Sequence, residues 1–340
     1  MKKIVLSLIA LVVTTVSFAQ NTLVAVLSHE TNVQMFYGPS ALVNAVEAAV
    51  SGDVITLSAG RFTPCNITKG ITIRGIGAEG ENVTQIRESS SYAGTISINI
   101  PELDENNFTI EGLDLSSTTN ILGASKGFMS KCKTGNISFN ASSSANLKMV
   151  NCNVSSLSLN GSSNLRLSNC IVNELTNASN STSKADVFNC YLRHYQYNSG
   201  YAYRCSFVNS ILINTYWGSY YIPENAVAMN CLFIELNSSG QSTIGIDCFK
   251  ATVPEVFASY ENIVIDARYN YKRDMPTTTL LSEEAKVNYL GTDGKEVGIY
   301  GGQYPYDLTP TYPRITTLNV AKQATADNKL SVEIEVTAAE

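Results

Sequence analysis

The chain has 340 residues, of which 44% are hydrophobic and 15% charged, and its formal net charge is −6. This length fits one large domain or two small ones, and the modest negative charge argues against a nucleic-acid partner. Low charge with abundant Ser, Thr, Asn and Gly is typical of many short strands joined by polar turns, not of helices.

Residues 1–19 have the pattern of a signal peptide. Lys2 and Lys3 form a positive n-region, residues 4–16 are apolar, and Ser17-Phe18-Ala19 is a small-x-small cleavage site. No later run approaches the roughly 20 apolar residues that a membrane helix needs. We therefore expect export to the periplasm, the outer cell surface or the medium, without membrane insertion.

A short helix is predicted after a lead-in over residues 20–38. Residues 41–50 are rich in alanine, Ser40 suits the N-cap, and Gly52 suits the position beyond the last turn. Short alternating strands punctuated by glycine follow, ending with Ile71-Thr72-Ile73-Arg74-Gly75.

This opening resembles that of right-handed parallel β-helix proteins of the pectate-lyase-like class. In that class the helix covers the first coil and hides its apolar end. The resemblance extends as a repeat pattern from Pro39 to Gly302. It implies an all-β, right-handed parallel β-helix over residues 39–312, but no specific enzyme family.

An Asn-Cys pair that returns about every 19 residues is the clearest repeat. The cysteines that recur through the middle of the chain are Cys132, Cys152, Cys170, Cys190, Cys205, Cys231 and Cys248. Such a period indicates one structural unit stacked on copies of itself, here in about ten coils. We expect the asparagine before each cysteine to lie at a coil corner and to bond to the asparagines above and below.

The eight cysteines of an exported protein would normally predict disulfides. If the repeated cysteines share one position on successive coils, their Cβ atoms lie about 4.8 Å apart, the strand spacing, which exceeds the roughly 3.5–4.5 Å of a disulfide. The spacing therefore predicts a column of buried, reduced thiols. No C-x-x-C pair is present, and we expect neither a metal site nor a cofactor.

One coil is longer than its neighbours when the cysteines set the register. Successive cysteines from Cys132 are separated by 20, 18, 20, 15, 26 and 17 residues. The 26-residue turn holds the only tryptophan, and insertions in a solenoid often form its binding face. Sugar rings stack on exposed aromatic side chains, so one hypothesis is a glycan site. The alternative is a structural role, in which alternate tyrosines lie half in the core and half at the surface, with their hydroxyls reaching water at a coil edge. The predicted ligand-binding residues of the glycan site are Tyr195, Tyr197, Tyr203, Tyr216, Trp217, Tyr220 and Tyr221.

Beyond Lys250, residues 253–312 are expected to form closing coils with longer loops. Their Gly298-Ile299-Tyr300-Gly301-Gly302 run, like Phe18-Ala19-Gln20, resembles a signature of β-helix proteins exported by gut-type Bacteroidota. Residues 313–340 contain two alternating segments. We expect them to pair as strands that cap the lower end of the helix.

Catalytic candidates are sparse. A polysaccharide lyase on this fold needs an Arg or Lys base, and a hydrolase needs clustered carboxylates. The residues that could assemble a lyase site are Arg193, His194, Arg204 and Glu224. No spacing rule brings Arg193 and Arg204 together, so catalysis is the less favoured hypothesis.

Residues 115–250 hold nine Lys/Arg against five Asp/Glu, which leaves −10 for the rest of the chain. This weakly basic middle is compatible with an acidic glycan, although a few surface lysines explain it equally well. The leading hypothesis is an exported, non-catalytic protein that binds polysaccharide or cell-surface glycan, or builds surface structure. The alternatives are a polysaccharide lyase or glycoside hydrolase acting on an acidic glycan, and a scaffold without a small ligand.

Overall fold

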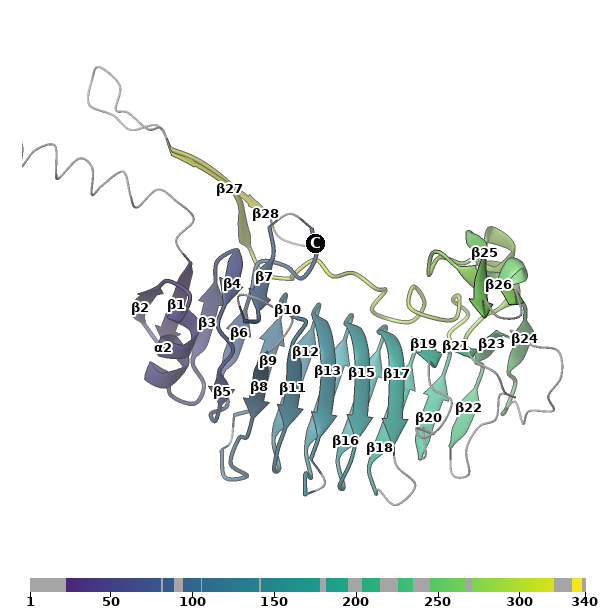
Figure 1. The fold of residues 1–340 in the computed structure, drawn as a ribbon, viewed down its shortest axis with the longest axis horizontal. Coiled ribbons are helices and arrows are strands. Elements are labelled where there is room, and N and C mark those ends of the chain that lie inside the picture. Colours follow the sequence, from purple (N-terminus) through teal and green to yellow (C-terminus); the bar gives the residue numbers. More distant parts are fainter. Residues whose placement is uncertain are drawn as a thin grey trace, which may run out of the picture.

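The computed structural model describes residues 23–80, 82–88, 94–104, 106–140, 142–177, 182–194, 204–214, 226–234, 245–266, 271–320 and 332–337. It is 48% strand and 8% helix and forms a parallel β-solenoid of about eight turns, as Figure 1 shows. The all-β solenoid predicted from the repeat is confirmed, with fewer turns than the ten expected. No helix within the described ranges is long and apolar enough to cross a membrane.

Two long sheets form the walls of the solenoid. The first, sheet A, has the order β2 (Asn32–Tyr37), β1 (Val24–His29), β3 (Val54–Leu57), β6 (Thr72–Arg74), β9 (Phe108–Glu111), β12 (Lys126–Ser130), β14 (Asn146–Val150), β16 (Asn164–Ser168), β18 (Lys184–Phe188), β20 (Cys205–Val208) and β22 (Val227–Met229). From β3 onward all of its pairings are parallel.

Sheet B faces sheet A across the core. Its main path is β24 (Phe249–Ala251), β23 (Leu232–Ile234), β21 (Ile211–Asn214), β19 (Tyr191–His194), β17 (Ile171–Asn177), β15 (Asn153–Leu159), β13 (Lys133–Phe139), β10 (Asp114–Leu115), β7 (Thr84–Ile86) and β4 (Gly60–Phe62). A branch leaves β13 through β11 (Thr118–Ile121), β8 (Thr95–Ile98) and β5 (Asn66–Ile67).

The branch point lies in the middle of β13. Lys133 and Thr134 pair with β10, while residues 137–139 pair with β11. Gly135 stands between them, where a Cβ would lie 2.5 Å from the Ser116 carbonyl oxygen. Only glycine allows this close approach. The turns before this junction have two short strands on this side, whereas β13, β15 and β17 are single strands of seven residues each.

The N-terminal end carries the predicted helix and an antiparallel hairpin. Strands β1 and β2 pair with each other, and β1 pairs antiparallel with β3. Helix α2 (Ala41–Ala48) buries Leu42 and Val46 in the main core. Ser40 precedes it, but its side chain makes no capping bond. Instead the Lys69 ammonium donates to the carbonyls of Val46, Glu47 and Ala49 at the C-terminal end of the helix, where a cation is favoured by the helix dipole.

The Asn-Cys pairs form the corner between sheet A and sheet B, as predicted. Asn151, Asn169, Asn189, Asn209 and Asn230 all have φ between 48° and 52°. Asparagine tolerates this left-handed conformation better than most residues. Each backbone N–H then continues the ladder across the corner; that of Asn169, for example, donates to Phe188 O at 3.1 Å.

The residue after each corner points into the core, and all eight cysteines are free thiols. The backbone N–H of Cys152 donates to Cys170 Sγ and that of Cys170 to Cys190 Sγ, at 3.5 and 3.4 Å. Each of these thiols in turn donates to the carbonyl two residues before it. The column of reduced thiols is confirmed, but its members are hydrogen-bonded rather than merely apolar.

Cys205 does not belong to this column. It lies in β20 and pairs with Ala185, whereas Ser210 follows the corner residue Asn209 and accepts from the Cys190 N–H at 3.1 Å. With Ser210 in register, the two turns from 190 to 231 have 20 and 21 residues. The predicted long turn is therefore wrong, because it resulted from aligning Cys205 with the corner cysteines.

The prediction that the corner asparagines bond to one another is wrong: within the part of the chain that the structure describes, no side-chain hydrogen bond joins two of them. Three of them, Asn151, Asn169 and Asn209, bind instead to a returning segment, residues 291–312, which we call the strap. Asn209 bonds to Thr292, Asn169 to Ile299 and Gly301, and Asn151 to Pro305. The strap thus runs along the corner toward the N-terminal end, as Figure 1 shows above the solenoid.

Residues 253–290 do not form the predicted closing coils. They contain α3 (Val253–Val256), the antiparallel hairpin β25 (Tyr260–Asp266) and β26 (Tyr271–Pro276), and α4 (Glu283–Asn288). Val256, Phe257 and Leu281 join a second core with outward residues of sheet B such as Ile211 and Leu232. The outer face of sheet B is apolar in the last turns, and this segment covers it.

The predicted C-terminal strand pair forms as β27 (Arg314–Val320) and β28 (Val332–Thr337), which pair antiparallel. The structure does not confirm that this pair caps the lower end of the helix. The strap brings Thr311 to Glu111, whose carboxylate accepts from its N–H and Oγ1 at 3.2 and 2.6 Å. The pair therefore begins beside β9, in the N-terminal half of the solenoid.

Candidate ligand-binding face

The outer face of sheet A carries exposed polar side chains at matching positions of successive strands. Asn146 on β14 pairs with Asn164 on β16, and Lys148 pairs with Arg166 in the same two strands. Arg166 in turn lies opposite Asp186 on β18. Because parallel strands stack in register, side chains two residues apart form two polar rows that cross the strands.

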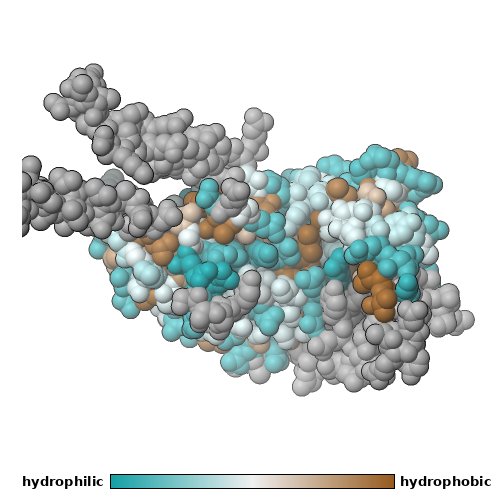
Figure 2. All heavy atoms as spheres, turned by 45° about the horizontal axis from the view of Figure 1, so that its top comes forward, coloured by the Kyte–Doolittle hydropathy of each residue, from teal (hydrophilic) through white to brown (hydrophobic). Residues whose placement is uncertain are grey.

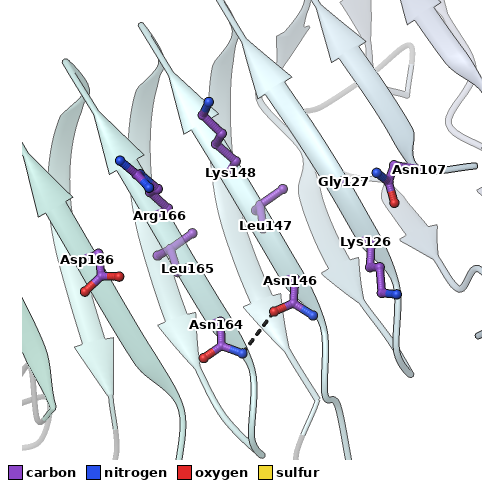
Figure 3. A pocket seen from close by; sticks show the side chains of 10 residues that line it. All are labelled: Asn107, Lys126, Gly127, Asn146, Leu147, Lys148, Asn164, Leu165, Arg166 and Asp186. Atoms are coloured by element: carbon purple, nitrogen blue, oxygen red, sulfur yellow. Dashed lines mark hydrogen bonds between the residues drawn. The ribbon is translucent and has the colours of Figure 1, made fainter.

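These rows line a shallow hollow of about 330 Å³. Figure 3 shows Lys126, Asn146, Lys148, Asn164 and Arg166 side by side on three neighbouring strands. The Asn164 amide donates to Asn146 Oδ1 at 2.9 Å. The hollow therefore offers amide and cationic groups that can donate hydrogen bonds to a ligand.

Positive charge dominates this face from β12 to β20. Four exposed cations lie on these strands and a fifth immediately precedes β20, against the single carboxylate of Asp186 on the same strands; the five are Lys126, Lys148, Arg166, Lys184 and Arg204. We call these five residues the basic face. Five cations and one anion give a local charge of +4 in a chain whose net charge is −6, so the charge is segregated rather than evenly distributed.

Two aromatic rings lie beneath cations of the same face. Lys148 Nζ is 5.7 Å from the centre of the Phe128 ring, and the Arg166 guanidinium carbon is 4.9 Å from that of Phe188. Such contacts are worth about 0.5–1 kcal/mol at exposed sites. They hold the two cationic side chains against the sheet, which reduces the entropy that each would lose on binding a ligand.

The side seen in Figure 2 is mostly hydrophilic or neutral, with small separate hydrophobic patches on the described residues. Within the described ranges, no group of three or more His, Cys, Asp or Glu side chains could hold a metal ion. Glu174 lies on sheet B and Asp186 on sheet A, so these two carboxylates do not form a catalytic pair.

The structure separates the predicted catalytic candidates that it describes. Arg193 lies on β19 of sheet B, whereas Arg204 immediately precedes β20 of sheet A and is exposed. Arg193 donates to Tyr191 Oη at 3.2 Å and to Pro276 O at 3.4 Å. It therefore joins sheet B to the β25–β26 hairpin and has a structural role there. His194 ends β19, opposite Asn214.

The remaining predicted site residues lie outside the described residues. They are Glu224, Tyr195, Tyr197, Tyr203, Tyr216, Trp217, Tyr220 and Tyr221. Their assignment as catalytic or glycan-binding residues stays a prediction. The turn from Ser210 to Cys231, which holds most of them, has an ordinary length of 21 residues and contains no insertion that would mark a binding face.

Sequence reasoning singled out only Arg204 of the basic face. The other residues become visible when the coils are aligned on their Asn-Cys corners. In that alignment residues 145–152 (Ala-Asn-Leu-Lys-Met-Val-Asn-Cys) match residues 163–170 (Ser-Asn-Leu-Arg-Leu-Ser-Asn-Cys). In this alignment a cation recurs at the outward position four residues before each cysteine, at 148 and 166.

Comparison with known proteins gives no independent guide to function. No protein-family model matches the chain, and no curated protein matches it.

Proposed function

We propose that the chain is an exported, non-catalytic protein that binds a polysaccharide along the outer face of sheet A. The observation that carries the proposal is the hollow between β12 and β18, with its ladder of amides and cations. Export is inferred from the N-terminal signal sequence alone.

An open, shallow groove suits an extended glycan better than a compact small molecule, because small-molecule sites are usually concave enough to bury most of the ligand. Asn146 and Asn164 supply amide donors and acceptors for sugar hydroxyls.

The alternative of a lyase or glycoside hydrolase has less support. A lyase built from Arg193 and Arg204 would need one side chain from β19 of sheet B and one from the turn that precedes β20 of sheet A. A hydrolase would need two carboxylates at close range, and among the described residues Asp186 is the only carboxylate that lines the hollow.

The test is retention of the purified chain on immobilised glycans, together with an assay for new reducing or unsaturated ends. The Asn146→Ala/Asn164→Ala double variant should lose retention. Asn136→Ala should not, because Asn136 is an equally exposed asparagine on β13 of sheet B. Product formation, or retention that survives the double variant, would contradict the proposal.

A further inference from the structure

The charges of the basic face follow the axis of the solenoid. Lys126, Asn146, Asn164 and Lys184 occupy one cross-strand row. Arg204 extends this row, because the next residue, Cys205, pairs with Ala185. The second row contains Phe128, Lys148, Arg166, Asp186 and Ser206.

The dimensions of this strip follow from sheet geometry. From β12 to β20 there are four strand spacings of about 4.8 Å, so the strip is about 19 Å long. The two rows are two residues apart along each strand, a separation of about 7 Å. Cations thus line a narrow, straight path across five strands, which matches an extended chain rather than a globular partner.

We propose that the ligand of this face is a linear acidic polysaccharide that lies across the strands, and that Asp186 limits its affinity. This inference rests on the proposed function and specifies its ligand. An acidic chain satisfies the local charge of +4, whereas a neutral chain would leave five cations without counter-charges along its length.

Asp186 lies directly in the ligand path. It is exposed, and its neighbours in register are Arg166 on one side and Ser206 on the other. Although Arg166 is the adjacent cation, the two form no ion pair within 4 Å; the guanidinium lies over Phe188 instead. The carboxylate therefore presents a negative charge to an acidic ligand and weakens its binding.

A nucleic acid fits these features less well. Single-stranded nucleic acids bind largely by stacking bases on open aromatic faces. Here the Phe128 and Phe188 rings already lie under Lys148 and Arg166.

Dextran and dextran sulfate provide a matched pair of probes, since they share a backbone and differ in charge; alginate adds a carboxylate polymer. We expect the purified chain to bind dextran sulfate, alginate or both, and to bind neutral dextran at least about tenfold more weakly. Binding should weaken severalfold between about 50 and about 500 mM NaCl, because salt screens exposed charges. Longer oligomers should bind more tightly than short ones.

Two variants test the residues. Lys148→Gln/Arg166→Gln should lower the affinity for the acidic polymer about tenfold, whereas Asp186→Asn should raise it about two- to fivefold, as expected for exposed charge pairs. The controls are Lys133→Gln on the outer face of sheet B and Glu261→Gln on β25, both exposed and away from sheet A. Thermal unfolding checks that each variant is folded.

The outcomes separate the two proposals. Equal binding of dextran and dextran sulfate, lost in Asn146→Ala/Asn164→Ala, would overturn the acidic ligand and keep the glycan-binding function. An Asp186→Asn variant that is folded but binds more weakly would overturn the role of Asp186. Absence of binding to every glycan would overturn both proposals, and tighter binding of single-stranded DNA through the same cations would replace the polysaccharide with a nucleic acid.

Discussion

The side-chain amide of Asn169 donates to the carbonyl oxygen of Gly301 at 2.8 Å, across 132 residues of sequence. The same amide also donates to Ile299 O at 2.9 Å. One side chain therefore fixes both the left-handed corner of a coil and the position of the strap. The corner asparagines satisfy the strap backbone, which would otherwise carry buried carbonyls without donors.

Replacing Asn169 should destabilise the protein more than replacing an exposed asparagine. Asn169→Ala removes two hydrogen bonds to buried carbonyls, each worth about 1 kcal/mol, and places alanine at φ 51°, which costs a further 1 kcal/mol or so. We expect the free energy of unfolding in urea to fall by about 3 kcal/mol.

Asn169→Gly isolates the two causes, because glycine accepts the left-handed conformation but cannot bond to the strap. The free energy of unfolding of Asn169→Gly should be about 1 kcal/mol higher than that of Asn169→Ala. The greater entropy of glycine in the unfolded chain reduces this difference. Asn164→Ala, on the exposed strand face, should change stability by less than about 0.5 kcal/mol. Equal losses at 164 and 169 would contradict the role of the strap bonds.

Replacing Gly301 with a larger residue should also destabilise the strap. A Cβ at this position would lie 1.8 Å from the Glu296 carbonyl oxygen and 3.0 Å from Asn189 Nδ2. Gly301→Ala should therefore cost about 1–3 kcal/mol, as overpacking does. It should also speed amide hydrogen exchange in residues 298–307, measured by mass spectrometry.

Gly294→Ala is the control for this prediction. Gly294 has φ 73°, but a Cβ there would meet nothing within 4 Å. It should therefore carry the cost of the left-handed backbone, about 1–2 kcal/mol, without the clash. Faster exchange in residues 298–307 of Gly294→Ala as well would show that crowding is not the cause.

The solenoid could be predicted from the sequence because its signals are local and repeated. The residues at 151–152 and 169–170 combine a left-handed corner with an inward thiol, and this pair is visible in any one coil. The register failed at Cys205 because cysteine also suits an inward strand position, and Ser210 can replace the corner thiol by accepting the same backbone N–H. A count of cysteines alone does not reveal that a serine can take the place of a cysteine at this position.

The partners of the corner asparagines could not be predicted for a different reason. A side chain such as Asn151, whose amide bonds to Pro305 O at 3.2 Å, carries no mark of a partner 154 residues away. The glycines of the strap were visible, but their purpose, close approach to Asn189 and Ile211, depends on the folded arrangement. Likewise, the basic face exists only when strands β12 to β20 stack in register.

The thiols should differ sharply in reactivity. A hydrogen bond from Cys231 lowers the pKa of the half-buried Cys248 thiol to about 7, whereas burial raises the pKa of Cys205 to about 12. The thiolate is the reactive form. Alkylation of native protein, read by mass spectrometry, should therefore modify Cys248 at a rate that rises as the pH passes about 7, and should leave Cys205 unmodified until the chain unfolds. Modification of Cys205 at the rate of Cys248 would contradict its burial.

Replacing Arg193 should lower stability without affecting binding, and replacing Arg204 should weaken binding without affecting stability. Arg193→Ala breaks the contacts to Tyr191 and Pro276, and hydrogen bonds of charged groups contribute about 1.5–3 kcal/mol. We expect lower stability with unchanged retention on acidic glycans. Arg204→Ala should give the reverse result, because this side chain is exposed and extends the basic face. Lost retention in a folded Arg193→Ala variant would restore Arg193 as a functional residue.

His29 should make stability depend on pH near neutrality. Its Nδ1 lies 2.6 Å from Asp53 Oδ1. This hydrogen bond is the main cause that raises the pKa of His29 above its usual 6.5, and the charges of Asp53 and Glu30 raise it further. Desolvation opposes these effects. A raised folded-state pKa means that the protonated form stabilises the fold. This contribution is fully present below about pH 6.5, the unfolded value, and is lost as the pH rises through the folded pKa. His29→Gln should remove this part of the decline in Tm between about pH 6 and 8.5. If the Tm of His29→Gln declines with pH as much as that of the unchanged protein, other groups cause the decline. The Asp53 carboxylate also accepts a hydrogen bond from the Val50 N–H at 2.8 Å, which this variant does not remove.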